Sequence, residues 1–171
     1  MLAFFSTEGR GAADALIAGV AERLRAEGVR LAGAVQRNID RPDRARCDMV
    51  LEVLDGTGTI PISQNLGAMA TACRLDPRGL ERAVGLAAAA VARADVDLLI
   101  VNKFGKQEAE GRGFRPVIGE AMAAGLPVLT TVNTENRAAF LAFSEGIAEE
   151  LPPDPDRILA WCRAAVGRAT G

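Results

Sequence analysis

The sequence has no histidine, and its 171 residues include only three cysteines, two lysines and 4% aromatic residues. Without histidine, imidazole metal ligands, Ser-His-Asp triads and histidine general bases are excluded. Cys47, Cys73 and Cys162 lie far apart and have no CxxC spacing, so they match neither a disulfide framework nor a zinc site. We therefore expect no metal site. The excess of Ala, Leu and Val over aromatic residues suits helices packed against a sheet.

Long hydrophobic runs and an excess of one charge are also missing. No apolar stretch approaches the roughly 20 residues that span a bilayer, because Asp95 and Asp97 interrupt the longest candidate. Residues 1–5 form too short an apolar stretch for a signal peptide. The formal net charge is −2, and both signs are mixed along the chain. The sequence therefore has no basic cluster that would indicate binding to nucleic acid or to an anionic membrane. We expect a cytoplasmic protein that binds neither.

Apolar runs alternate with helical patterns along the chain. The expected strands are residues 2–5, 29–36, 49–54, 59–62, 96–101, 127–132 and 147–151. The expected helices are residues 12–27, 78–93, 116–124, 137–143 and 156–168. This alternation predicts an α/β fold, namely a three-layer, mostly parallel sheet with helices on both faces. We expect one domain over residues 1–171.

Two features of this sheet can be specified further. An Asp-Gly turn at residues 55–58 separates two short runs and predicts a small β-hairpin insertion, and Pro61 places its second strand at a sheet edge. We also predict that the strand ending at Val101 lies beside the strand ending at Phe5. Right-handed crossovers would then bring Gly9 and Lys103 to the same edge of the sheet.

A polar, glycine-rich loop at residues 101–114 follows the buried strand 96–101. In open α/β sheets, ligands bind beyond the carboxyl ends of the strands, in loops of this kind. The chain's only lysines, Lys103 and Lys106, both lie here, which suggests that an ammonium group has a function in this loop. Together with Arg112 they are expected to converge on an anionic ligand. The alternatives are a solvated surface turn and, for Arg112, a solvated charge.

Other residues of this loop join the candidate ligand-binding site. Gly105 lets the backbone approach a ligand closely, and Asn102, Gln107 and Glu108 supply polar side chains beside the lysines. The alternative for Glu108, and for Glu110, is a simple ion pair with the lysines. We expect no catalytic residue among them.

A glycine-containing turn at residues 6–11 separates the first strand from the first helix. At Gly9, Arg10 and Gly11, backbone N–H groups of a helix N-terminus can point at a bound oxyanion, and Arg10 adds a positive charge. The alternative is a tight strand-to-helix turn without a ligand. Asn133 follows another strand at the same edge and is either a further ligand-binding residue or the N-cap of a helix.

The order of these elements resembles the small P-loop nucleoside triphosphatases and their relatives in molybdopterin-dinucleotide assembly. The first loop of that family reads G-x-x-G-x-G-K-S/T. The matching stretch here is residues 6–13, in which Gly9 and Gly11 match. Ala12 replaces the phosphate-binding lysine, and Ala13 replaces the magnesium-binding hydroxyl.

The second motif of the family is a strand followed by Asp-Glu, an apolar residue, then Gly-Lys-Met-Glu. Here Gly105, Lys106 and Glu108 match, whereas Asn102 and Lys103 replace the two acidic residues. Residues 102–114 also resemble a bacterial family of unknown function that is sometimes associated with molybdenum or nitrogen-fixation genes.

The resemblance implies a fold without ordinary nucleoside triphosphatase chemistry. A P-loop enzyme uses its lysine on the β- and γ-phosphates and its hydroxyl and strand-end Asp on Mg²⁺. All three groups are missing here, so we expect a non-catalytic or regulatory domain that binds a nucleotide, phosphate or a tetrahedral oxyanion such as molybdate. The alternatives are a cryptic enzyme of phosphoryl or nucleotidyl transfer and a protein-interaction module without a small ligand. A homo-oligomer or a protein partner stays open.

Overall fold

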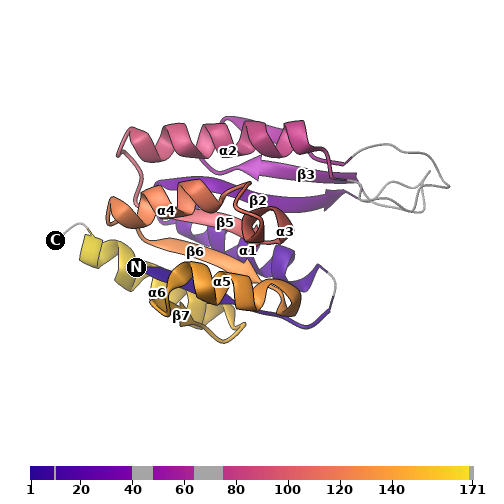
Figure 1. Cartoon of the computed structure of the whole chain (residues 1–171). Helices are drawn as coiled ribbons and strands as arrows, with labels where there is room; N and C mark the ends of the chain where they lie inside the picture. Colours follow the sequence, from indigo (N-terminus) through magenta and orange to yellow (C-terminus); the bar gives the residue numbers. More distant parts are fainter. Residues whose placement is uncertain (10, 40–47, 64–74, 170–171) are drawn as a thin grey trace.

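The computed structural model of the chain describes residues 1–9, 11–39, 48–63 and 75–169. Strands of these residues form a seven-stranded sheet in the order β4-β3-β2-β5-β6-β1-β7 (Figure 1). Neighbours from β2 to β7 pair in parallel, whereas β3 pairs antiparallel with both β2 and β4. The strands are β1 (Leu2–Phe5), β2 (Leu31–Ile39), β3 (Asp48–Val53), β4 (Gly58–Pro61), β5 (Leu98–Phe104), β6 (Val128–Val132) and β7 (Ala148–Glu150).

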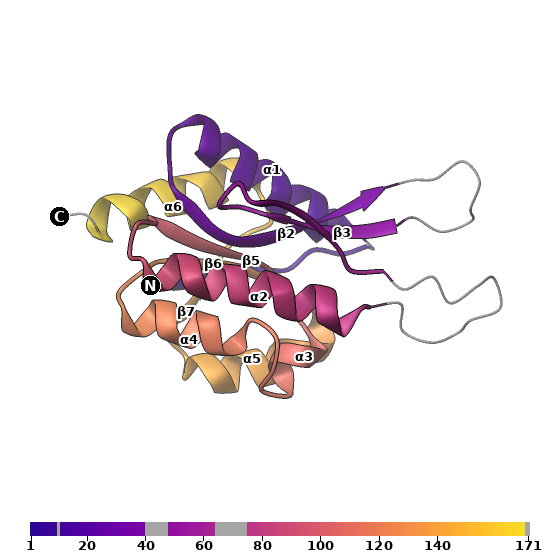
Figure 2. The same cartoon turned by 90° about the horizontal axis from the view of Figure 1, so that it is seen from above.

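Helices cover both faces of this sheet, which gives three layers. Figure 2 shows α1 and α6 on one face and α2, α4 and α5 on the other. The helices are α1 (Ala12–Ala26), α2 (Pro77–Ala92), α3 (Lys106–Ala109), α4 (Arg115–Ala123), α5 (Arg137–Ser144) and α6 (Pro155–Ala169), with a 3-10 helix, η1 (Thr134–Asn136). Within the described residues, no helix is long and apolar enough to cross a membrane.

Two apolar clusters fill the spaces between the sheet and its helices. On one face, α1 and α6 contribute Ile17, Leu24 and Ile158, which are fully buried against the sheet. On the other face, the ring of Phe140 from α5 lies 4.8 Å from that of Phe4 and 5.1 Å from that of Phe104, centroid to centroid. Burial of each such side chain contributes roughly 1.5–3 kcal/mol, so the ends of β1 and β5 are firmly anchored.

The sequence patterns predicted this architecture. The mostly parallel sheet with helices on both faces is confirmed, and so is the hairpin, whose strands β3 and β4 meet around residues 54–57. Pro61 lies on β4, at the edge of the sheet, where its missing N–H breaks no ladder. Helix α2, expected over residues 78–93, begins one residue earlier at Pro77, and the Asp76 carboxylate caps it by accepting a hydrogen bond from the backbone N–H of Arg78 at 3.0 Å.

One prediction of strand order was wrong. Strand β5 does not lie beside β1, because β6 is inserted between them and pairs in parallel with both. The carboxyl ends of β1 and β5 nevertheless share one edge of the sheet. Buried parallel strands carry similar apolar runs, so their hydrophobicity does not specify which two are neighbours.

The loop predicted for residues 101–114 is also more regular than expected. Strand β5 continues to Phe104 with a register irregularity after Val101, and α3 follows directly. Cys47 and Cys73 lie outside the described residues.

Candidate functional site

The candidate site lies at the edge of the sheet where the parallel strands end. The ends of β1 and β6 are tied together there, because the Ser6 hydroxyl donates a hydrogen bond to the carbonyl of Val132 at 2.6 Å. The ends of β5 and β6 are tied similarly, because the buried Thr131 hydroxyl donates to the carbonyl of Asn102 at 2.7 Å. These side-chain bonds fix the strand ends from which the functional loops begin.

The glycine turn leads from β1 into α1. Gly9 and Gly11 have φ angles of 88° and 80°, in the left-handed region that favours glycine. Gly11 is the N-cap of α1, so this turn leads into the helix end whose first backbone N–H groups have no partner within the helix. Arg10, the third predicted residue of this turn, lies outside the described residues.

A polar cluster joins the first turn of α1 to the ends of β5 and β2. The Asp14 carboxylate accepts hydrogen bonds from Asn102 Nδ2 at 2.8 Å and from Gln36 Nε2 at 3.4 Å. Asn102 Oδ1 accepts the backbone N–H of Gln36 at 2.8 Å. Gln36 Nε2 also donates to Asn38 Oδ1 at 2.9 Å. Asn102, the strand-end residue that the sequence singled out, therefore belongs to an internal network.

Sequence reasoning missed Asp14, Gln36 and Asn38. Asp14 was visible as an acidic residue in the first helical turn, where it complements the helix dipole. Gln36 is only 7% exposed, and a buried amide in an apolar strand is a signal that it has hydrogen-bonding partners. No pattern in the sequence indicates that Asp14 meets Gln36 and Asn38, because Asp14 lies on α1 and the other two lie on β2.

Glu108 has a different role from the ion pair considered above. Its side chain is only 4% exposed, and its two carboxylate oxygens accept the backbone N–H groups of Gly105 and Phe114, each at 2.9 Å. A Cβ atom on Gly113 would lie 2.2 Å from Glu108 Oε1, so only glycine leaves room for this carboxylate. Glu108 thus closes the loop between β5 and α4 from within.

The charged side chains of the same loop remain on its surface. Lys103 is exposed and forms no ion pair with the part of the chain that the structure describes. Lys106 Nζ lies 3.9 Å from Glu110, and its side chain is 83% exposed. Arg112 donates to Gln107 Oε1 at 3.0 Å and forms an ion pair with Glu110. No described contact joins these groups to the glycine turn, so their convergence on a ligand stays a prediction.

Asn133 begins η1 as its N-cap. Its side-chain oxygen accepts the backbone N–H of Asn136 at 3.1 Å and the Asn136 Nδ2 group at 2.7 Å. The capping alternative of the sequence analysis therefore describes Asn133 in this structure. Its amide nitrogen takes part in neither bond, and a contact with a ligand stays a prediction.

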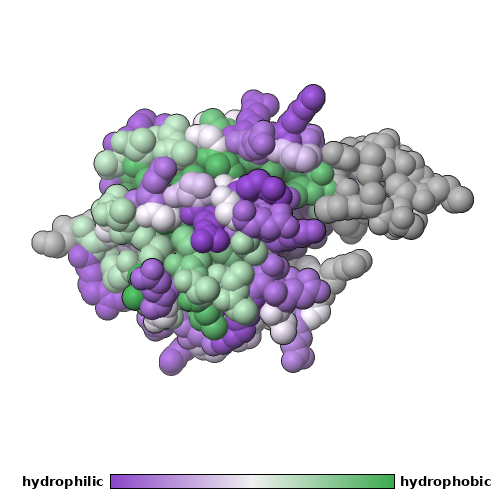
Figure 3. Space-filling view, in the orientation of Figure 1, coloured by the Kyte–Doolittle hydropathy of each residue, from purple (hydrophilic) through white to green (hydrophobic). Residues whose placement is uncertain are grey.

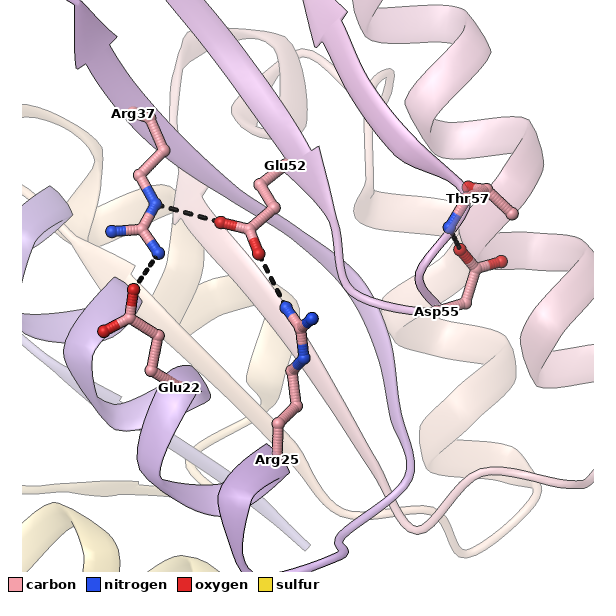
Figure 4. Close-up of polar contacts among 6 residues, drawn as sticks. All are labelled: Glu22, Arg25, Arg37, Glu52, Asp55 and Thr57. Carbon is pink, nitrogen blue, oxygen red and sulfur yellow. Dashed lines mark hydrogen bonds and ion pairs between the residues drawn. The ribbon is translucent and has the colours of Figure 1, made fainter.

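A network of ion pairs connects α1 to the hairpin behind the site (Figure 4). Arg37 on β2 contacts Glu22 of α1 and donates to Glu52 of β3 at 3.0 Å, and Arg25 of α1 donates to Glu52 at 2.6 Å. Burial acts to raise the pKa of Glu52, but the hydrogen bonds from its two arginines outweigh burial and lower the pKa below its usual value. The network holds β2, which carries Gln36 and Asn38, against α1.

Two further groups in the described residues bear on chemistry. Burial raises the pKa of Cys162 to about 12, so this buried thiol is not a nucleophile at neutral pH. Among the described residues, no group of at least three Cys, Asp or Glu side chains is arranged to hold a metal ion.

The chain is similar to known proteins in sequence and in fold. It is 43% identical over 157 residues to the molybdenum import ATP-binding protein ModC 2 of Bradyrhizobium diazoefficiens. This alignment covers 91% of the chain but only 17% of that much longer protein. Among solved structures, the crystal structure of THEP1 from the hyperthermophile Aquifex aeolicus matches with a TM-score of 0.66 and 15% identity, covering 100% of both chains. At that identity the likeness concerns the fold alone, which is P-loop NTPase-like.

A family model provides the most direct assignment. The model of a family described as "Protein of unknown function (DUF2478)" matches residues 2–161, which is nearly the whole chain. The chain therefore belongs to the DUF2478 family.

Proposed function

We propose that this protein is a non-catalytic or regulatory P-loop-like domain that binds a nucleotide, phosphate or a tetrahedral oxyanion such as molybdate at the carboxyl edge of its sheet. The observation that carries the proposal is the 2.8 Å hydrogen bond from Asn102 Nδ2 to Asp14. This bond lies where the P-loop family places the strand-end carboxylate that helps to hold Mg²⁺.

The Asp14–Asn102 bond supports binding rather than turnover. Asn102 is neutral, and both ends of its amide are occupied by internal hydrogen bonds, so this residue supplies no carboxylate for a metal ion. Ala12 and Ala13 add neither the lysine nor the hydroxyl of the motif. We therefore expect no release of phosphate from ATP or GTP above background, with Mg²⁺ present.

The edge still offers positive groups to an anion. Lys103 and Lys106 are exposed on an anchored loop, and Lys103 has no carboxylate partner among the described residues. The backbone N–H groups at the start of α1 add a partial positive charge. The name of the relative, a molybdenum import ATP-binding protein, supports both an oxyanion and a nucleotide as candidate ligands.

A thermal-shift screen identifies the ligand first. ATP and GTP with and without Mg²⁺, phosphate, sulfate, molybdate and tungstate are each added to the purified protein. A ligand that binds only the native state raises the unfolding midpoint by mass action. We expect at least one anion to do so without requiring Mg²⁺.

Lysine variants then locate the site. An ammonium that contacts an oxyanion forms a charge-assisted hydrogen bond worth roughly 1.5–3 kcal/mol. Lys103→Ala and Lys106→Ala should each weaken binding by about ten- to a hundredfold at fixed ionic strength. The control is Arg93→Ala, because Arg93 is the C-cap of α2 and lies at the opposite edge, where β5 begins. Unchanged affinity in both lysine variants and their double variant would refute this site.

A second candidate function, a protein-interaction module, is favoured by one surface feature. Figure 3 shows hydrophobic surface over α4 and α5. The exposed fractions of Leu141 on α5 and of Ile147 after it are 39% and 65%. The homologous segment in the relative is a small part of a longer protein, which also supports a role as a module. If no anion shifts the unfolding midpoint, this reading becomes the better one.

The cryptic-enzyme alternative has its own outcome in these experiments. Phosphate release that follows the protein through purification and disappears in Lys103→Ala would favour nucleotide-dependent transfer over binding alone. The missing motif groups at Ala12, Ala13 and Asn102 weigh against that outcome.

A further inference from the structure

Of the Asp and Glu residues that the structure describes, Glu108 alone is buried, with 4% of its surface exposed. Removing a carboxylate from water is costly unless hydrogen bonds replace the lost hydration. Glu108 receives that compensation from two backbone N–H groups, those of Gly105 and Phe114. Both belong to the loop that carries the two lysines, so the buried carboxylate acts on the backbone of this loop.

The two bonds connect the lysine segment to the core. Glu108 Oε2 accepts the N–H of Gly105, which lies between Lys103 and Lys106 in the sequence. Glu108 Oε1 accepts the N–H of Phe114, whose side chain is 3% exposed in the cluster beneath α4 and α5. The backbone next to both lysines is thereby held at a fixed place above that cluster.

The Lys103 side chain depends on the same backbone. Its neighbours Asn102 and Phe104 are 5% and 0% exposed, so the alternation of the strand turns Lys103 outward at the end of β5. Its Cγ and Cδ atoms lie 3.8 and 3.9 Å from the position that a Cβ on Gly105 would occupy. The stem of Lys103 therefore passes close to Gly105, while Lys106 follows Gly105 directly and begins α3.

We propose that Glu108 is a positioning residue of the anion site, which holds Lys103 and Lys106 in place for an anionic ligand and does not contact that ligand itself. The inference rests on the proposed function and adds to it how the site is organised before the ligand arrives. A lysine on a fixed backbone loses less freedom on binding than a lysine on a loose loop, so the affinity of the site is higher. The same carboxylate brings a negative charge close to an anion. Positioning and charge therefore predict effects of opposite sign.

Two substitutions of Glu108 separate these effects. Sodium molybdate, inorganic phosphate and ATP are titrated into the parent, Glu108→Gln and Glu108→Asp at fixed ionic strength. Gln removes the charge and one acceptor oxygen, whereas Asp keeps the charge but is one methylene too short to reach both N–H groups. If Glu108 positions the lysines, both variants should bind roughly tenfold more weakly. If it acts only through its charge, Gln should tighten binding and Asp should leave it unchanged.

The matched control removes the same charge from the same loop. Glu110 lies 3.9 Å from Lys106 Nζ and is 40% exposed, and its described contacts are with side chains at the surface. Glu110→Gln should therefore bind anions at least as tightly as the parent. A second control, Ile158→Val, lowers stability at a fully buried site on α6, on the opposite face of the sheet from α3 (Figure 2). It should leave affinity unchanged.

Two further variants test whether Glu108 acts through the lysines. Gly113→Ala would place a Cβ 2.2 Å from Glu108 Oε1, so it displaces the carboxylate without changing the charge, and it should weaken binding as well. In a Lys103→Ala background, Glu108→Gln should weaken binding by a smaller factor than in the parent, because one of the groups that it positions is already missing. A general loosening of the protein would instead cost the same factor in both backgrounds.

The outcomes distinguish this inference from the proposed function. If the parent binds none of the three anions, or if the lysine variants bind as the parent does, both fail. If Lys103→Ala weakens binding but Glu108→Gln and Glu108→Asp do not, the role of Glu108 is refuted and the site stands. An equal loss in the two backgrounds also refutes it. All titrations are made well below the thermal unfolding midpoint of each variant, so that a loss of affinity does not reflect unfolding.

Discussion

The buried carboxylate of Glu108 leads to a sharp prediction about stability. Its two oxygens accept the backbone N–H groups of Gly105 and Phe114 at 2.9 Å, in a site where the residue is 4% exposed. Removing it leaves two donors without a partner, at a place that water enters poorly. A hydrogen bond to a charged group contributes about 1.5–3 kcal/mol, and an unsatisfied buried donor costs about 1–3 kcal/mol.

These magnitudes rank two substitutions. Glu108→Ala should lower the free energy of unfolding by about 2–4 kcal/mol, since the two bonds are not fully additive. Glu108→Gln keeps the shape and one acceptor oxygen but turns an NH₂ group toward the other N–H. It should cost roughly half as much. The matched control is Glu110→Ala, because Glu110 is 40% exposed and its ion pairs lie on the surface. It should cost less than about 0.5 kcal/mol.

Urea unfolding measures all three variants. Circular dichroism follows the helices, and Trp161, the only tryptophan, reports on the packing of α6. The capping role is refuted if Glu108→Ala unfolds at the same urea concentration as Glu110→Ala. Loss of anion binding without loss of stability in Glu108→Ala would instead support direct contact of Glu108 with the ligand.

Three further predictions concern the rest of the sheet. Gly33→Ala should destabilise the protein by roughly 3 kcal/mol in urea unfolding, because its Cβ would lie 1.9 Å from the carbonyl oxygen of Ile100 and its φ is 101°. The folded-state pKa of Glu52 is lowered, so its contribution is complete above the unfolded-state pKa and is lost as the pH falls through the folded-state value. The stability difference between the parent and Glu52→Gln should therefore shrink in acid, from about 1 kcal/mol at pH 7. Asn102→Asp should destabilise the protein at pH 7, measured by thermal unfolding, and acid should restore stability, because two carboxylates would meet where Asn102 and Asp14 are now 2.8 Å apart.

Much of the fold follows from the sequence because periodicity and end signals are local. The apolar face of α1, the Pro77 start of α2 and the hairpin at residues 54–57 each depend on neighbours within a few residues. The placement of β6 between β1 and β5 does not, since several buried strands have interchangeable apolar patterns.

The candidate site was predicted less completely, for a related reason. Residues 101–114 and the glycine turn could be found because each lies at a strand end within one stretch of sequence. The Glu108 side chain points inward because the chain folds back on it six residues later, at Phe114. In the sequence, only the glycine at position 113 indicates this contact, because a larger residue there would collide with Glu108. The contacts of Asp14 with Asn102 and Gln36 join residues 88 and 22 positions apart, so no single stretch contains them.

The distribution of satisfied and unsatisfied groups at this edge bears on how a ligand would bind. No buried side-chain polar atom of the described residues lacks a partner, and Asn102 and Glu108 are committed to internal bonds. Among the described candidate residues, the donors left for a ligand therefore include the exposed ammonium groups of Lys103 and Lys106. Interactions of exposed ammonium groups are screened by salt, with a Debye length of about 10 Å at 0.1 M ionic strength. Anion affinity at this site should accordingly fall as the ionic strength rises.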